Sequence, residues 1–146
     1  MINAVKENRR AYLNVIVDRI DDYFYKRKRY GQHFSLAIIL SDPDIDISTF
    51  NEHNRQTDIF IVLEKNLCCE VFDGTTAESG IKAASILLTD FESHFYAKRI
   101  FTGIVFSKDY DTSTQMVNRL FDILEYAYSH KMENVMVDNT LMIKDY

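Results

Sequence analysis

The chain has 146 residues and a net charge of −5, with 47% hydrophobic and 27% charged residues. This length suits one domain with one sizeable core, and the acidic balance disfavours nucleic-acid binding. No apolar run is long enough to insert into a membrane and no signal peptide opens the sequence, so we expect a cytoplasmic domain. A longer, even membrane-bound, protein could contain it.

Apolar residues at helical spacing predict a first helix over residues 8–28, which Tyr30-Gly31 ends. The elements expected after it are a buried strand at 34–40, a short helix at 47–54, strands at 58–63 and 67–72 joined by a turn at 64–66, a helix at 75–91, a strand at 100–106, a helix at 113–129 and a hairpin of 134–137 with 141–143. Thr75 and Glu78 have the spacing of a capping box at the start of the helix over 75–91.

The middle of this order is βαββαβ, the ferredoxin-like arrangement. We therefore predict one α+β domain over residues 1–146, with an antiparallel sheet that helices cover on one face. Many functions use this arrangement, so the function has to come from particular residues.

Three local patterns give little indication of a binding or catalytic site. The basic run at 26–29 could contact phosphate or acidic lipid, but a solvated last helical turn explains it better. Alternating aspartates at 42, 44 and 46 resemble the start of a calcium loop, yet Ile47 and His53 stand where glycine and glutamate are needed, which favours a solvated turn. The cysteines and histidines form no catalytic or metal-ligand spacing, so we expect no cofactor.

Five strings of the sequence keep one register: NRRAYL at 8–13, FSL at 34–36, RQTD at 55–58, DGT at 73–75 and FDILEYAYS at 121–129. In this order they resemble the NRRAYL, FSLLLLDID, RxxD, PGT and ADxALYxAK strings of GGDEF domains, the diguanylate cyclase family. The resemblance implies a fold like that of this family and of other nucleotidyl cyclases. It also places residues 64–68 in the slot of the GGDEF signature itself.

The resemblance implies that catalytic positions have been lost. Family members hold two divalent cations with one carboxylate after the first strand and one at the fourth signature position, where this chain has Leu40 and Leu67. Leucine offers no lone pair to a cation. The two signature glycines, which let substrate approach the backbone, correspond to Glu64 and Lys65, and the third position holds Asn66.

Two further positions agree with this loss. The phosphate-binding lysine of the last family string corresponds to Ser129, and the arginine of a following GRN string corresponds to Glu133. Each change removes a positive charge that would stabilise the transferred phosphate. We therefore expect that this domain is degenerate and is not an enzyme.

The resemblance also implies one retained site. In the family, RxxD is the primary inhibitory site for cyclic di-GMP, and Arg55 and Asp58 hold its two defining positions. An arginine fork suits a guanine edge or a phosphate, and a carboxylate suits guanine N–H groups. The helper arginine of the family corresponds to Leu87. Three other cations could take its place: Lys82, Arg9 and Arg10.

Three functions remain open at this point. The first is a cyclic di-GMP receptor that uses Arg55 and Asp58, by analogy with degenerate GGDEF receptors that control exopolysaccharide secretion in bacterial signalling. The second is a ligand-free scaffold that binds a protein partner or forms a homodimer. The third is an enzyme of altered chemistry, for which the sequence shows no catalytic arrangement of residues.

Overall fold

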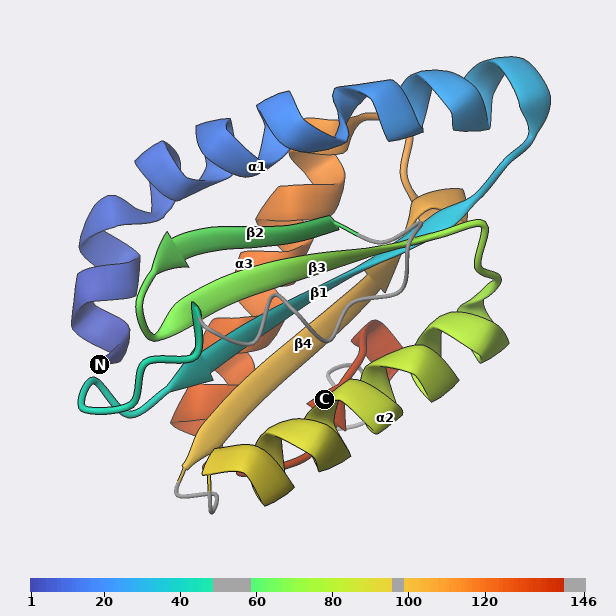
Figure 1. Cartoon of the computed structure of the whole chain (residues 1–146). Helices are drawn as coiled ribbons and strands as arrows, with labels where there is room; N and C mark the ends of the chain where they lie inside the picture. Colours follow the sequence, from blue (N-terminus) through green and yellow to red (C-terminus); the bar gives the residue numbers. More distant parts are fainter. Residues whose placement is uncertain (49–58, 96–98, 141–146) are drawn as a thin grey trace.

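The computed structural model, which describes residues 1–48, 59–95 and 99–140, consists of helices packed on one β-sheet (Figure 1). Its elements are α1 (Ile2–Tyr30), β1 (Phe34–Ser41), β2 (Ile59–Glu64), β3 (Leu67–Asp73), α2 (Ala77–Phe95), β4 (Ile100–Phe106), the 3-10 turn η2 (Ser107–Asp109), α3 (Ser113–Ser129) and β5 (Met136–Val137). The predicted helix at 47–54 falls almost wholly outside the described residues. None of the described helices is both long enough and apolar enough to cross a membrane.

The strands form a mixed sheet with the order β2-β3-β1-β4-β5. β1 lies in the centre and pairs antiparallel with both β3 and β4, as expected for the ferredoxin-like arrangement. β5 pairs with β4 in parallel. The predicted α+β class is therefore confirmed, whereas the second arm of the predicted C-terminal hairpin lies outside the described residues.

Helices cover both faces of this sheet, so the prediction of a single covered face was wrong. α2 lies in front of the sheet in Figure 1 and α3 lies behind it. One core cluster joins α1 and α3 to the sheet, and a second joins α2 to its opposite face. The cause is visible in β1, where all eight residues are buried, because a strand that is apolar on both faces requires cover on both.

α1 begins six residues before the predicted start, since Ile2 and Val5 are buried against the core. Its end agrees with the prediction. Gly31 has a φ of 68° and donates its backbone N–H to the carbonyl of Arg27 at 3.0 Å, a left-handed helix cap. Arg27, Lys28 and Arg29 of the basic run lie in this last turn, and Lys26 precedes it.

The cap of α2 lies one residue later than predicted. Thr76 and Ser79 exchange hydrogen bonds between side chain and backbone, with Thr76 N to Ser79 Oγ at 2.8 Å and Ser79 N to Thr76 Oγ1 at 3.2 Å. Thr75 is buried instead. Its hydroxyl donates to the carbonyl of Phe72 and lies 2.7 Å from the hydroxyl of Ser35 on β1. This buried polar link fixes the start of α2 against the central strand.

Candidate functional site

The two positions that the resemblance assigns to metal-binding carboxylates lie together in the structure. Leu40 on β1 and Leu67 on β3 are direct partners across the strand pair. Partners of this kind place their side chains on the same face of the sheet, a few ångströms apart. Both leucines are 1% exposed and belong to the core cluster that joins α1 and α3 to the sheet. The two positions are therefore adjacent in the sheet, and buried apolar side chains occupy both.

The turn in the signature slot is tied to neighbouring backbone. Lys65 and Asn66 form the turn between β2 and β3. The carbonyl of Lys65 accepts a hydrogen bond from the N–H of Ile47 at 2.7 Å. Asn66 accepts from the N–H of Ser41 with its carbonyl at 2.9 Å and donates to the Ser41 carbonyl with its side chain. Because Ile47 is fully buried, the segment after β1 closes against this turn.

Glu64 links the signature slot to α1. Its carboxylate accepts a hydrogen bond from the Tyr12 hydroxyl at 3.0 Å. Burial, followed by the hydrogen bond and the negative charge of Glu64, raises the pKa of Tyr12. Tyr12 belongs to the NRRAYL string, so this contact joins two of the segments that carry the resemblance.

A second residue of the same string joins α1 to α3. Arg9 donates to the carboxylates of Asp122, at 2.8 Å, and Glu125 and to the Asn118 carbonyl at 2.7 Å. Its guanidinium also lies 5.5 Å from the centre of the Phe121 ring. Two carboxylates therefore occupy Arg9, which removes it from the candidates for the helper cation.

We expect Arg9→Ala to lower the free energy of unfolding by about 1–2 kcal/mol, because the hydrogen bonds between α1 and α3 are lost from a partly buried site. Arg9→Lys should recover only part of this loss, since an ammonium cannot form the same fork. Urea denaturation measures both. Arg10→Ala is the matched control, because Arg10 is exposed; an equal loss in that variant would contradict the assignment.

Other positions of the family pattern have local structural roles. Ser129 is exposed at the end of α3, where its hydroxyl donates to the Tyr126 carbonyl at 3.1 Å. Glu133 is exposed. Asn134 has a φ of 57° and exchanges hydrogen bonds with the backbone of Ile100 at the start of β4. Ser129 and Glu133 therefore present exposed side chains near the C-terminal end of α3.

The acidic segment after β1 makes contacts with protein groups. Asp42 accepts from the backbone and side chain of Arg99, which lies just before β4. Hydrogen bonds from the hydroxyl and then the N–H of Ser48 lower the pKa of Asp46. Within residues 1–48, 59–95 and 99–140, the acidic, histidine and cysteine side chains form no group of three suited to a metal ion.

The two cysteines are free and buried. Burial and, to a lesser degree, the negative charge of Asp46 raise the pKa of Cys68 to about 12. Burial also raises the pKa of Cys69. A thiol reacts through its thiolate, so these values describe inert core residues.

The predicted ligand residues, Arg55 and Asp58, lie outside the described residues. The helper position Leu87 is 7% exposed and packs in the cluster beneath α2. Lys82, which could replace the helper, is exposed on α2.

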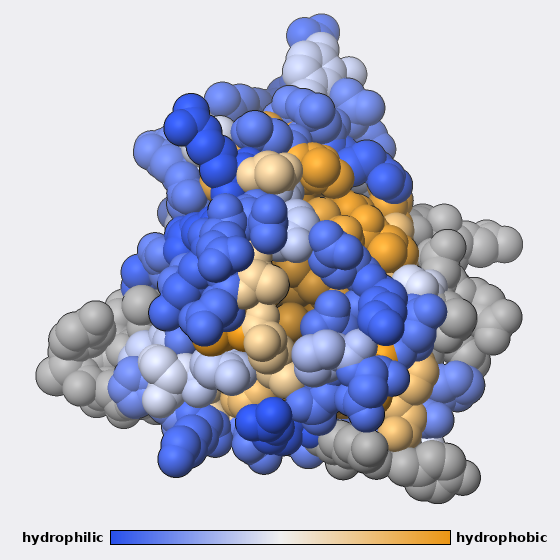
Figure 2. Space-filling view, turned by 90° about the vertical axis from the view of Figure 1, so that its left-hand side faces the viewer, coloured by the Kyte–Doolittle hydropathy of each residue, from blue (hydrophilic) through white to orange (hydrophobic). Residues whose placement is uncertain are grey.

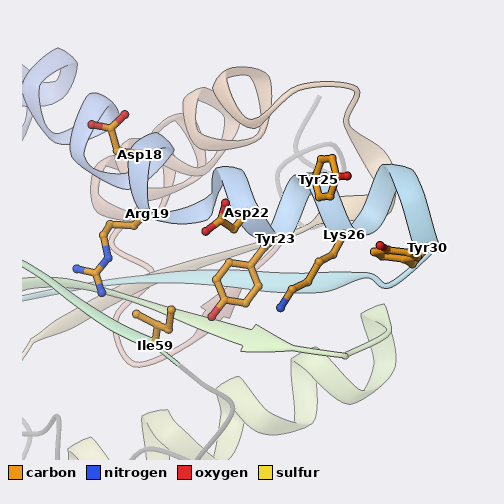
Figure 3. A pocket seen from close by; sticks show the side chains of 8 residues that line it. All are labelled: Asp18, Arg19, Asp22, Tyr23, Tyr25, Lys26, Tyr30 and Ile59. Carbon is orange, nitrogen blue, oxygen red and sulfur yellow. The ribbon is translucent and has the colours of Figure 1, made fainter.

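One pocket was missed by the sequence analysis. It has a volume of about 560 Å³ and is lined by residues of α1 between Asp18 and Tyr30 and by Ile59 of β2. Figure 3 shows Arg19, Tyr23 and Lys26 reaching from α1 toward the sheet and Ile59. The signal in the sequence was their spacing, since residues 19, 23, 26 and 30 recur at the helical period.

The comparisons with known proteins bear on the fold. No family model and no curated protein matches the sequence. Among solved structures, the chain is similar to a microbial GGDEF domain described in a novel interaction mode with bis-(3′,5′)-cyclic di-GMP. The TM-score is 0.63 at 11% sequence identity, over 81% of this chain and 86% of that chain. At this identity the similarity concerns the architecture alone, and the chain has a GGDEF-like fold.

Proposed function

We propose that this chain is a degenerate GGDEF-like domain that makes no cyclic di-GMP and binds it as a receptor through Arg55 and Asp58. The observation that carries the proposal is the partnership of Leu40 and Leu67 within a GGDEF-like fold. These two positions are direct partners on neighbouring strands and both hold leucine, which supports the loss of a metal-binding pair.

The loss of catalysis is supported by several independent substitutions. Phosphoryl transfer to an attacking hydroxyl depends on cations and donors that neutralise phosphate charge. Leucine supplies neither at positions 40 and 67, and Ser129 replaces a cation with a neutral hydroxyl that is occupied by the Tyr126 carbonyl. The signature turn carries two long side chains, Glu64 and Lys65, in place of glycines.

The receptor role is supported by sequence and by fold. Arg55 and Asp58 keep the RxxD spacing directly before β2. An arginine fork and a carboxylate three residues apart can together read a guanine edge. The structural neighbour was described with cyclic di-GMP, which makes this ligand the first to test.

Calorimetric titration with cyclic di-GMP tests the proposal, with GTP as the control ligand. We expect saturable binding of cyclic di-GMP that Arg55→Ala weakens by more than about tenfold, because a charged bidentate contact is lost. Arg55→Lys should not restore it, since the fork is absent. Lys6→Ala removes the same charge from an exposed position of α1 and should bind like the parent. Unchanged affinity of Arg55→Ala would overturn the receptor assignment.

A ligand-free scaffold is the second candidate, and exposed apolar side chains favour it. Ile86 on α2 is 64% exposed and Val62 on β2 is 46% exposed. Figure 2 shows apolar side chains open to solvent among hydrophilic ones on the side that carries the start of α1. Sedimentation analysis tests this candidate, because a scaffold for a second copy should dimerise without nucleotide. The receptor assignment instead requires that cyclic di-GMP binds in the titration.

A further inference from the structure

The pocket between α1 and β2 has the composition of a nucleotide site. Its volume of about 560 Å³ is within the range of small-molecule pockets. Arg19, Tyr23, Lys26 and Tyr30 lie along one face of α1, and Ile59 lines the pocket from the sheet. Arg19 and Lys26 are seven residues apart, so their backbones are separated by two helical turns, about 10 Å.

The two cations are not engaged by neighbouring carboxylates. Asp22 and Lys26 have the spacing of a helical ion pair, yet among the described residues neither they nor Arg19 form one. The ammonium of Lys26 lies 5.3 Å from the centre of the Tyr23 ring instead, and Figure 3 shows it on the side of α1 that faces the sheet. Arg19 and Lys26 therefore have no carboxylate partner among the described residues, and the carboxylates of Asp18 and Asp22 line the same pocket.

The remaining groups suit a purine base. Tyr25 and Tyr30 are exposed aromatic rings at the pocket, and an aromatic ring can stack on a base. Asp22 adds an exposed carboxylate, which can accept hydrogen bonds from the adjacent N1–H and N2–H groups of guanine. Adenine has no such pair of adjacent donors. Ile59 directly follows Asp58, the last residue of RxxD, in the chain.

From this arrangement we infer that the pocket binds one guanosine phosphate unit of cyclic di-GMP, with Arg19 and Lys26 on phosphate and Asp22 on the guanine edge. This inference rests on the proposed receptor function and adds a site on α1 to it.

The test is calorimetric titration of the full chain with cyclic di-GMP and with cyclic di-AMP. Arg19→Ala/Lys26→Ala should weaken cyclic di-GMP binding at least about tenfold, because two charged contacts are removed. The matched control is Lys6→Ala/Lys28→Ala, which removes the same charge from exposed residues of the same helix outside the pocket and should stay within about twofold. Asp22→Asn should reduce the preference for cyclic di-GMP over cyclic di-AMP.

The outcomes separate the two claims. If Arg55→Ala abolishes binding while Arg19→Ala/Lys26→Ala binds like the parent, the receptor assignment stands and the α1 pocket is rejected. Equal weakening by both double variants would also reject the pocket, because general charge would explain the effect. If Arg19→Ala/Lys26→Ala loses binding and Arg55→Ala does not, the pocket stands and RxxD is not the site. No binding by the parent chain overturns both.

Discussion

Placing carboxylates at positions 40 and 67 with Leu40→Asp and Leu67→Glu should destroy the fold before it permits any catalysis. Both leucines are 1% exposed in the core cluster beneath α1 and α3. Each substitution removes a buried apolar side chain and places an ionisable group among apolar neighbours, which costs about 4 kcal/mol or more. Domains are stable by about 5–15 kcal/mol, so each single variant should be strongly destabilised and the double variant unfolded at neutral pH.

Urea denaturation of the single variants measures this effect, and Val62→Glu is the control. Val62 is 46% exposed on β2, in the same part of the sheet, so an acidic side chain there should change stability by at most about 0.5 kcal/mol. The loss of stability in Leu40→Asp should depend on pH. Burial raises the pKa of a carboxyl above its unfolded value, so the penalty for charge disappears below about pH 4 and grows as the pH rises.

The free energy of unfolding of Leu40→Asp should therefore differ less from that of the parent chain at pH 4 than at pH 7. Unchanged denaturation midpoints in both single variants would show that positions 40 and 67 lie in a solvated cleft. We propose that catalysis was lost through changes at more positions than 40 and 67. Magnesium-dependent synthesis of cyclic di-GMP from GTP by the double variant would overturn this proposal.

Gly80→Ala is the second substitution from which we expect a large effect. A Cβ added to Gly80 would lie 2.1 Å from the hydroxyl and 2.8 Å from the Cβ of Ser35. Rotation of the hydroxyl relieves the first contact but not the second, because the Cβ of Ser35 is fixed to the backbone of the central strand. Alanine favours a helix over glycine by about 1 kcal/mol, and the steric conflict should exceed that gain. We expect a net loss of about 2–3 kcal/mol.

A double-mutant cycle with Ser35→Gly isolates the contact. Ser35→Gly removes both conflicting atoms, so Gly80→Ala should cost much less in that background, and the coupling energy should favour the double variant. Ser85→Ala serves as the control on the exposed side of α2 and should leave stability within about 0.5 kcal/mol. Additive effects of Gly80→Ala and Ser35→Gly would contradict the close packing of α2 on β1.

Periodicity predicted most element positions because their apolar spacing is regular. The bounds of α3 agree at both ends, where Thr112 accepts from the N–H of Gln115 as the cap. The start of α2 was misplaced by one residue because Thr75 and Thr76 are adjacent and either can cap a helix. Burial of Thr75 against Ser35 decides between them, and that contact joins residues far apart in the sequence.

The layering was harder to predict than the elements. β1 is apolar at nearly every position, so alternation could not show which side chains meet α2 and which meet α3. The candidate site was predictable only through the resemblance, which aligned Leu40 and Leu67 with the carboxylate positions. Their direct partnership is a matter of strand register, and register depends on the whole sheet. The α1 pocket required knowledge of how α1 lies over β2.

The position of β1 has a consequence for how the molecule opens. Its residues Leu36 and Leu40 belong to the cluster beneath α1 and α3, whereas Ala37 and Ile39 belong to the cluster beneath α2. Neither helical layer can separate from the sheet without exposing β1, which contributes side chains to both clusters. Amide hydrogens of β1 should therefore exchange with solvent only through global unfolding, and the two helical layers should melt as one cooperative unit.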